Sequence, residues 1–370
     1  MKVVGVVFSN IHDRGVRELT VNRTLASVPF GGRYRLIDFV LSNMVNSGIT
    51  KVGVITKQNY QSLMDHVGSG KYWDLSRKNG GLMVLPPFGA AAGSTLYSSR
   101  FEALCNIVQF LRRSDEDYVV LSDCDIICNI DFSDVVQKHI DNHCDITLVY
   151  RRQEYGGGYD RIAVETDKSG RVTSMTPADK LTGERKMNTN MYVINREFLL
   201  KLIENAAELN LKSFSHDVLM RGVKEYRIYG YEHKGYFALI DSVASYYKYS
   251  LELLDKEKRD ELFYNNGASI YTKVRDSAPM RIEDTARVSD SLIADGCVIE
   301  GDVTGSILFR GVRVSKGAVV KNSILFQNTT ICTGSRLNCV IADKGVKILE
   351  GRELSGHPTH PYTIAKNTVI

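Results

Sequence analysis

A polar loop near the start of the chain holds a position at which α/β proteins often bind phosphate. Val3–Phe8 is an apolar run of strand length, and SNIHDRGVREL follows it at 9–19. Phosphate-binding loops are normally rich in glycine, because their backbone N–H groups must approach the phosphate closely. This loop has one glycine, Gly15, and an aspartate, Asp13, whose negative charge would oppose a phosphate. Its position favours nucleotide binding, whereas its residues disfavour it.

Two carboxylates form a second candidate site. Asp123 and Asp125 come just after the apolar run Tyr118–Leu121 and stand two positions apart. Residues two apart in a strand share a face, so their carboxylates would point into the same space. This pair favours an enzymatic site.

The elements that must position these residues alternate between strands and helices up to about residue 262. Val3–Phe8 and Val52–Thr56 are predicted strands on either side of a helix over Leu36–Asn46, whose apolar residues recur at helical spacing. Such a βαβ unit implies a parallel sheet that binds ligands at the carboxyl ends of its strands. The pattern also predicts helices over Phe101–Arg113 and Asp241–Phe263 and strands over Tyr118–Leu121 and Ile146–Tyr150.

A six-residue period replaces this alternation from about residue 286. Apolar residues and glycines both recur at this spacing, in the series Leu308, Val314, Val320, Phe326 and Gly305, Gly311, Gly317. The period predicts a left-handed parallel β-helix, whose coils bury a core by stacking on one another. An ordinary β-sandwich is the weaker alternative. We therefore predict an α/β domain over 1–262, a linker over 263–285 and a β-helix domain with a C-terminal tail over 286–370.

Composition argues against several classes of protein. The 370 residues are 43% hydrophobic and 24% charged with a net charge of +4, which supports a buried core but not a nucleic-acid-binding stripe. No apolar run is long enough to span a membrane, and no signal peptide is recognisable. The seven cysteines have irregular spacing, so we expect reduced thiols and a cytoplasmic protein with no nucleic-acid or membrane partner.

Several long strings resemble one enzyme family. SVPFGGRYRLIDFVLSNMVNSGI at 27–49, HVGSGKYWDL at 66–75 and NGGLMVLPPFG at 79–89 are similar to bacterial glucose-1-phosphate adenylyltransferases, the ADP-glucose pyrophosphorylases. The resemblance covers nearly the whole chain and includes the β-helix. It implies a Rossmann-like nucleotidyltransferase domain with a mostly parallel mixed sheet. It also implies a tetrameric, magnesium-dependent enzyme that makes ADP-glucose and pyrophosphate from ATP and glucose-1-phosphate for glycogen synthesis.

The same resemblance shows which functional positions have changed. The arginine of the family's glycine-rich loop falls on Gly15, its following lysine on Leu25, and its second metal-binding aspartate on Leu239. Other residues of the family are replaced as well. Asn10, Ile11 and Asp13 stand where the family has loop glycines, and Lys57 stands where it has an adenine-side glutamine. Pro177 and Ala178 replace a glutamate–lysine pair, and Asn188 replaces a sugar-contacting serine. Adenylyl transfer needs backbone donors, fixed cations and Mg²⁺ against the developing negative charge. We therefore expect no intact catalytic set.

A remnant of the nucleotide and sugar pocket is still recognisable. Asp125 falls on the family's first metal position and is the candidate Mg²⁺ ligand, while Asn188 and Asp217 fall on pocket positions. Asp217 could instead cap the helix that follows it. The glycine-rich stretch EYGGGYDR at 154–161 is predicted to be a flexible surface loop.

Two neighbouring residues could compensate for the losses. Asp241 could replace the carboxylate missing at Leu239, although it would be displaced by about 6.5–7 Å along a strand. Arg14 could replace the arginine missing at Gly15.

The replacements resemble those of a non-catalytic paralogue found beside a catalytic subunit in some Gram-positive bacteria. The resemblance implies a regulatory or structural subunit that enhances a catalytic homologue within a heterotetramer, self-associates and requires no cofactor for this role. Effectors of the family bind between the two domains through basic residues. The candidates here are Arg33, Arg35, Arg310 and Arg313, which could equally form interface ion pairs.

Two other functions stay open on the sequence. A weakly active nucleotidyltransferase would make ADP-glucose or another nucleotide sugar and would need Mg²⁺, with Asp125 as its metal ligand. A β-helix acyltransferase ranks well below both, because its chemistry usually needs a base such as histidine at a coil interface. No histidine lies between 288 and 356, and His357 and His360 belong to the tail.

Overall fold

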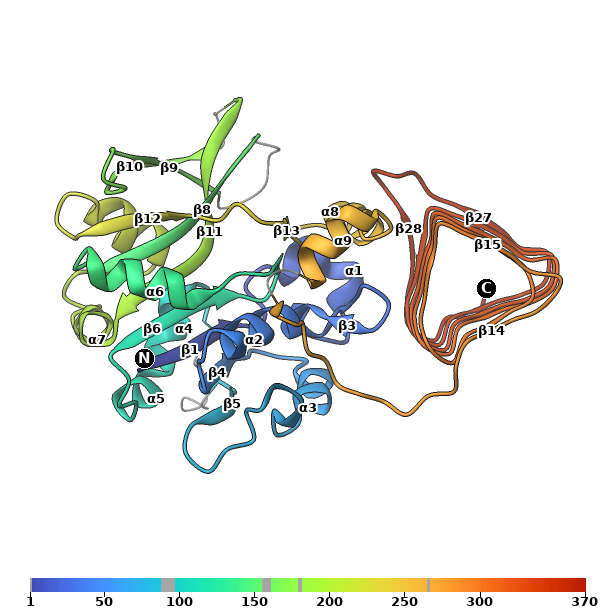
Figure 1. Ribbon diagram of the computed structural model, residues 1–370, viewed down its shortest axis with the longest axis horizontal. Coiled ribbons are helices and arrows are strands. Elements are labelled where there is room, and N and C mark those ends of the chain that lie inside the picture. The colour runs from blue at the N-terminus through green and yellow to red at the C-terminus, as the bar shows by residue number, and fades with distance from the viewer. Residues whose placement is uncertain (1, 88–96, 155–160, 179–181, 265–266) are drawn as a thin grey trace.

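A computed structural model describes residues 2–87, 97–154, 161–178, 182–264 and 267–370. An α/β domain forms the first part of the chain, and a triangular prism of short strands forms the second (Figure 1). Most of the stretch 154–161 lies outside the described residues. Within the described residues, no helix is both long enough and apolar enough to cross a membrane.

A nine-stranded mixed sheet is the centre of the α/β domain. Strand β1 (Val3–Phe8) lies between β4 (Lys51–Ile55) and β6 (Tyr118–Asp123) and runs parallel to both. Antiparallel pairing begins at β11 (Glu184–Asn195), which joins β6 to β8 (Ile146–Glu154). The other strands of this sheet are β5 (Gly81–Leu85), β9 (Ile162–Thr166), β10 (Val172–Pro177) and β12 (Ile228–Glu232). This arrangement confirms the predicted parallel βαβ start and the mixed sheet.

Helices cover both faces of the sheet because its central strands are apolar on both sides. Val3 and Val7 of β1 pack with α2 (Leu36–Asn46), and Val4 and Val6 pack on the other face with α4 (Arg100–Asn106). Among the described residues before position 243, the other helices of at least four residues are α1 (Arg17–Thr20), α3 (Gln61–Val67), α5 (Val108–Arg112), α6 (Phe132–Asp141), α7 (Arg196–Glu204), the π-helical η5 (Phe214–Met220) and the 3₁₀ turn η1 (Asp13–Val16). The small pairs β2 (Pro29–Phe30) with β3 (Tyr34–Arg35) and β7 (Ile126–Cys128) with β13 (Phe237–Leu239) complete the domain.

The helix predicted over Asp241–Phe263 is wrong in one respect, because two helices occupy that span. They are α8 (Val243–Glu252) and α9 (Lys256–Phe263). Asp255 separates them: its carboxylate accepts a hydrogen bond from the Glu257 N–H at 2.9 Å and caps the second helix. The helical pattern over 101–113 is likewise divided, at Ile107, into α4 and α5.

Three five-stranded parallel sheets form the walls of the prism. The first wall consists, in order of stacking, of β14 (Arg281–Ile282), β17 (Val298–Ile299), β20 (Arg313–Val314), β23 (Thr330–Ile331) and β26 (Lys347–Ile348). The second consists of β15 (Arg287–Ser289), β18 (Asp302–Thr304), β21 (Val319–Lys321), β24 (Arg336–Asn338) and β27 (Glu353–Ser355). The third consists of β16 (Leu292–Ile293), β19 (Ile307–Leu308), β22 (Ile324–Leu325), β25 (Val340–Ala342) and β28 (Tyr362–Ile364). Gly311 occupies a corner turn with φ of +72°, which favours glycine. The predicted left-handed parallel β-helix is confirmed.

The six-residue period also predicts that Phe326 points into the prism core with Leu308, and this prediction is wrong. Leu308 stacks on Leu325 of the next coil, so the repeat loses one position there. Phe326 therefore leaves the prism core, and its ring lies 5.1 Å from Phe309 and 6.2 Å from Tyr246 of α8, measured between centroids.

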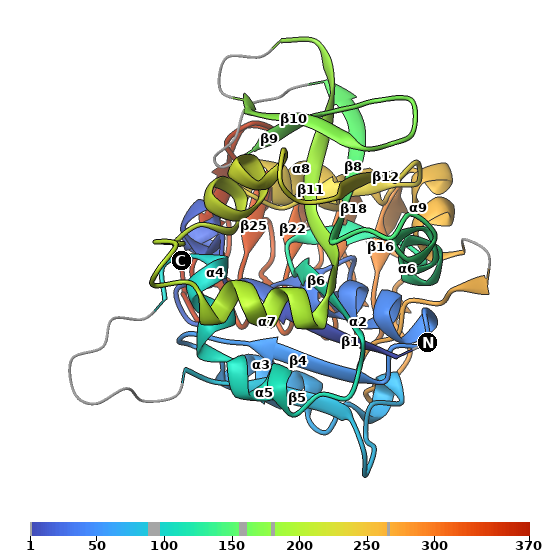
Figure 2. The same cartoon turned by 90° about the vertical axis from the view of Figure 1, so that its left-hand side faces the viewer.

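One wall of the prism packs against the α/β domain, since residues of both belong to one apolar cluster. Figure 2 looks through the α/β domain toward this wall, which contains β22 and β25. Ile307, Ile324 and Ile341 point outward from that wall, yet all three are fully buried in the same cluster as Phe30 and Tyr246. This shared apolar core fixes the orientation of the β-helix relative to the nucleotidyltransferase-like domain.

Candidate nucleotide-site remnant and interdomain pocket

The loop after β1 is held closed by its own aspartate. Asp13 accepts a hydrogen bond from the Leu25 backbone N–H through Oδ1 at 3.1 Å. Burial raises the pKa of Asp13 to about 6, although this hydrogen bond opposes the change. Leu25, at the position of the family's lysine, is 1% exposed and belongs to the apolar core. The loop therefore presents no cation at this position.

Gly15 lies against the strand-to-helix junction that precedes α8. A Cβ atom at residue 15 would be 2.0 Å from the carbonyl oxygen of Asp241, far inside contact distance. Any side chain at this position would force the backbone apart. The arginine of the family's loop cannot be accommodated here, and Arg14 beside it is exposed.

Asp123 and Asp125 meet as predicted, but cations of the protein already contact both. Nε of Arg100 donates to both Asp123 oxygens at 3.1 Å, and Nη2 also contacts Oδ2. His12 contacts Oδ2 of Asp125 through Nδ1. His12 and Arg100 are themselves close, with 3.4 Å between Nε2 and Nη2. Two buried carboxylates thus face two cationic or ionisable groups.

The electrostatics of this four-residue cluster favour charged partners. Burial alone would lower the pKa of Arg100, but the Asp123 carboxylate raises it above its ordinary value. Burial also lowers the pKa of His12, and the Asp125 carboxylate outweighs that effect and raises it. Burial nevertheless raises the pKa of Asp123, although Arg100 opposes this change, so the chain's own groups offset the buried negative charge in part.

His12, Asp123 and Asp125 together form a candidate donor set for a divalent metal ion. Ligand atoms of His12, Asp123 and Asp125 lie within 4.8 Å of one another, and Oδ1 of Asp125 is buried without a hydrogen-bond partner among the described residues. Mg²⁺ requires oxygen ligands in near-octahedral geometry. Arg100 and His12 occupy three of the four carboxylate oxygens, so the residues present do not fit Mg²⁺.

Asp241 does not supply the missing metal ligand. Its Oδ2 lies 2.5 Å from Nη2 of Arg161, which pairs it with a cation. Leu239 stands opposite Ile126 in the small antiparallel pair β13–β7 and offers no oxygen. Asp241 therefore does not replace the carboxylate that is missing at Leu239.

The sugar-side positions serve local structure. Nδ2 of Asn188 donates to the Tyr192 hydroxyl at 2.7 Å, at an irregularity in the pairing of β11 with β8. Asp217 accepts backbone N–H bonds from Lys212 and Ser213 at 2.9 and 2.8 Å. Asp217 lies within η5, whose N-cap is Ser213, so the prediction that it caps a following helix is wrong; its carboxylate instead ties the residues before η5 to the helix. On the adenine side, Nζ of Lys57 lies 4.5 Å from the centroid of the Tyr97 ring.

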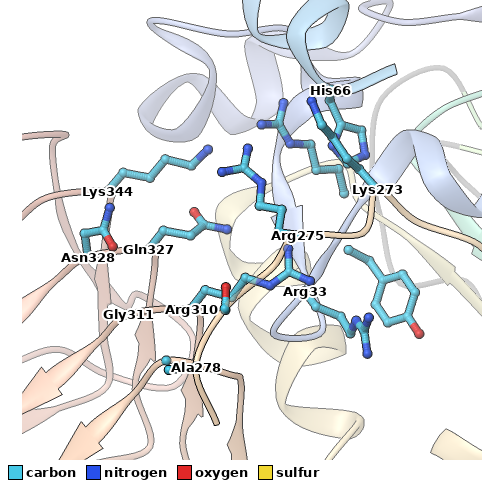
Figure 3. Close-up of a pocket in the computed structure, with 14 residues that line it drawn as sticks. Arg33, His66, Lys273, Arg275, Ala278, Arg310, Gly311, Gln327, Asn328 and Lys344 are labelled. Atoms are coloured by element: carbon cyan, nitrogen blue, oxygen red, sulfur yellow. The ribbon is translucent and has the colours of Figure 1, made fainter. Parts of the chain in front are cut away.

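A second site lies between the domains and is strongly cationic (Figure 3). We call it the interdomain cation pocket: a cavity of about 420 Å³ whose lining includes Arg33, Arg35, Lys273, Arg275, Arg310 and Lys344. The α/β domain, the linker and the prism each contribute two of these cations. No acidic side chain belongs to its described lining. Such a concentration of cations without carboxylates suits a multiply charged anion.

Burial and mutual repulsion both act on these cations. Burial and the neighbouring Arg35 and Arg23 lower the pKa of Lys344 to about 7. Burial lowers the pKa of Arg35 to about 10. Of the four sequence candidates, Arg33, Arg35 and Arg310 line the pocket, whereas Arg313 is exposed on β20 and does not.

Sequence reasoning missed several residues of both sites. His12 and Arg100 lie in a loop and a helix that gave no motif, and Lys273, Arg275 and Lys344 are isolated cations in the chain. They converge only through the packing of separate elements. The one local signal was His12, which stands beside Asp13 in a loop already marked as unusual.

Replacement of Gly15 by alanine tests the closed loop. We expect Gly15→Ala to lower the free energy of unfolding by about 1–3 kcal/mol, because the new methyl group would overlap the Asp241 carbonyl. Urea unfolding followed by circular dichroism measures this. Arg14→Ala, in the same turn but exposed, is the control and should change stability by less than about 0.5 kcal/mol. Equal stability of Gly15→Ala and wild type would show that the loop does not pack on residue 241.

Comparison with known proteins agrees with this fold. The nucleotidyl transferase family model matches residues 15–256, and the GlmU-like, C-terminal hexapeptide model matches residues 278–361. The glycogen biosynthesis protein GlgD of Bacillus subtilis (strain 168) is 34% identical over 368 residues, which cover 100% of this chain and 97% of the relative.

Two proteins of Geobacillus stearothermophilus are also similar. Its glycogen biosynthesis protein GlgD is 38% identical over 343 residues, and its glucose-1-phosphate adenylyltransferase is 32% identical over 323 residues. Each alignment covers 86% of this chain and 83% of the relative. The predicted family is confirmed: this chain belongs to the nucleotidyl transferase family, among the glycogen biosynthesis proteins GlgD and the glucose-1-phosphate adenylyltransferases.

Proposed function

We propose that this chain is a regulatory subunit of a glucose-1-phosphate adenylyltransferase in glycogen biosynthesis. It would act in the cytoplasm, self-associate, and join a catalytic homologue in a heterotetramer whose activity it raises. Similarity to two proteins named GlgD supports the pathway. The regulatory role itself depends on the state of the nucleotide-site remnant.

One observation carries the proposal: Arg100 and His12 occupy oxygens of the carboxylates that a metal ion would need. A metal-dependent phosphoryl site keeps its carboxylates open so that the ion can bridge them to the substrate. Here the cations are permanent parts of the chain, and the loop opposite is closed by Asp13 and Gly15. The remnant has the properties of a structural ion-pair cluster rather than of a site that exchanges ligands.

A subunit without turnover can still change the rate of its partner. Contacts across the interface must favour the partner's active state over its inactive state. A bias of about 1–3 kcal/mol corresponds to a change of roughly 5–150-fold in effector affinity or in the active population. No cofactor is needed for such a role.

One observation favours the alternative of a weakly active nucleotidyltransferase. Oδ1 of Asp125 is buried without a partner among the described residues, and one potential ligand atom each of His12, Asp123 and Asp125 lie within 4.8 Å of one another. Activity by that route would require Arg100 to leave Asp123, and it would need Mg²⁺.

A mixing assay separates the two functions. Pyrophosphate release from ATP, glucose-1-phosphate and Mg²⁺ is measured for this chain, for a catalytic subunit from the same organism, and for their mixture. We expect no release by this chain alone, co-elution of the two chains, and several-fold faster release by the mixture. Asp125→Asn in this chain should leave that enhancement unchanged.

Two outcomes would contradict the regulatory proposal. One is a mixture whose rate equals the sum of its parts and whose chains elute separately. The other is release by this chain alone that Asp125→Asn abolishes, which would establish the weak enzyme instead.

We further propose that the interdomain cation pocket binds a polyanionic, phosphate-bearing effector. The support is its six cations, drawn from both domains and the linker, with no acid in the described lining. An anion there would relieve repulsion across the domain interface and so stabilise one arrangement of the two domains. Arg310 is held in place by Asp295, with 3.0 Å between Nε and Oδ1.

The pH dependence of anion binding tests this pocket. Sulfate keeps a constant charge from pH 6 to 8, whereas Lys344 has a pKa of about 7 in the free protein. A bound anion raises that pKa, so binding takes up a proton. Sulfate affinity should therefore be highest below pH 7 and fall above it, by at most about tenfold per pH unit.

Isothermal titration calorimetry of sulfate at several pH values gives this profile. Lys344→Arg keeps the positive charge without a titration near neutrality, so its profile should be flat over the same range. A wild-type affinity that does not change with pH, or an equal slope in Lys344→Arg, would contradict the assignment.

A further inference from the structure

A buried ion pair joins the nucleotide-site remnant to the wall of the interdomain cation pocket. Nη2 of Arg23, in the α/β domain, lies 2.7 Å from both oxygens of Asp343 in the prism. The two side chains are 3% and 7% exposed. The guanidinium also lies 6.0 Å from the centroid of the Phe326 ring, at the shared apolar core. This pair is therefore a direct polar contact between the domains, shielded from water.

The Arg23 end of the pair belongs to the segment that holds the closed loop. Leu25, two residues on, donates its backbone N–H to Asp13 at 3.1 Å. Ala26 donates to the Ser9 carbonyl at the end of β1, also at 3.1 Å. The position of Arg23 therefore bears on the loop that contains Asp13.

The Asp343 end belongs to the pocket wall. Lys344, the next residue, lines the pocket, and its backbone N–H donates to Oδ1 of Asp343 at 2.6 Å. The Asp343 carbonyl accepts a hydrogen bond from Thr329 at 3.1 Å, which fixes this corner of the prism. Asp343 therefore connects the pocket cation Lys344 to Arg23.

The charges around this connection determine how an anion in the pocket would act on Arg23. Arg23, Arg35 and Lys344 repel one another, and Asp343 is the carboxylate that attracts Arg23 and Lys344. An anion in the pocket attracts Lys344 and Arg35, so the net repulsion that they exert on Arg23 falls. Arg23 is then held more firmly in its contact with Asp343.

We propose that the Arg23–Asp343 pair couples anion occupancy of the interdomain cation pocket to the conformation of the loop and segment over 9–28. Arg23 and Asp343 are positioning residues, since neither lines the described pocket nor contacts the Asp123–Asp125 cluster. This inference depends on the anion site proposed above, and it adds the route by which a ligand there acts on the remnant.

Hydrogen–deuterium exchange of the full chain, with and without saturating sulfate, tests the coupling. In wild type, sulfate should slow exchange of peptides within 19–28 at least threefold. Asp343→Asn keeps the size of the side chain and an acceptor for the Lys344 N–H, but it removes the charge. In this variant the sulfate effect on 19–28 should disappear while sulfate still binds. The exchange is measured at saturating sulfate and at pH 6, because Asp343 raises the pKa of Lys344 and its loss reduces the positive charge of Lys344 near neutrality.

This split between binding and response distinguishes coupling from structural damage. Arg23→Gln removes the other partner of the ion pair and should likewise abolish the slowing of exchange in 19–28 by sulfate. The test therefore needs only one of the two variants, Asp343→Asn or Arg23→Gln, to fold. Asp145→Asn is the matched control: it removes an Arg–Asp pair, Arg227–Asp145 at 2.9 Å, that lies within the α/β domain. It should keep the full sulfate effect.

The possible failures are distinguishable. Sulfate binding to wild type without slower exchange in 19–28, or equal protection in Asp343→Asn, would overturn the coupling and leave the pocket assignment intact. Absence of sulfate binding to wild type would overturn the pocket assignment and the coupling together.

Discussion

Neutralisation of Asp123 and Asp125 by Arg100 and His12 is the interaction on which the functional argument depends. Buried carboxylates require compensation, and the chain can provide it with a metal ion and substrate or with its own side chains. This structure uses side chains. Under the proposed regulatory role the site receives no metal, and such a site needs neither an open loop nor a second acidic ligand at residue 239.

The two halves of the molecule are then joined by contacts of different kinds. An apolar interface with Ile324 and Phe326 at its centre sets the orientation of the prism, while the Arg23–Asp343 pair adds a charge-sensitive contact beside it. The interdomain cation pocket lies at the same junction and draws on both domains and the linker. Our proposal of an anion site depends on this shared position of the pocket and the charge-sensitive contact.

Periodicity predicted the parallel βαβ start and the prism, because both periods report directly on burial, whereas the mixed sheet was predicted from family resemblance. The helix over Leu36–Asn46 and the strand pairing around β1 follow from apolar spacing, and the prism follows from the hexads. The errors have local causes: the cap at Asp255 divides one helix, and the loss of one position between coils moves Phe326 out of the prism.

The candidate site was less predictable. Family resemblance identified what was lost at Gly15, Leu25 and Leu239, but no sequence pattern indicated what had replaced it. Arg100 reaches Asp123 from a helix, and Lys344 meets Arg35 only because the prism docks on the α/β domain. Contacts between residues so far apart in the chain follow from tertiary packing, which a single sequence does not reveal.

Equilibrium dialysis with radiolabelled ATP, with and without Mg²⁺, tests the central claim most directly. If Arg100 and His12 take the place of the metal, wild type shows no Mg²⁺-dependent binding of ATP, and Asp125→Asn behaves in the same way. Binding of one ATP per chain that requires Mg²⁺ and is lost in Asp125→Asn would contradict the account.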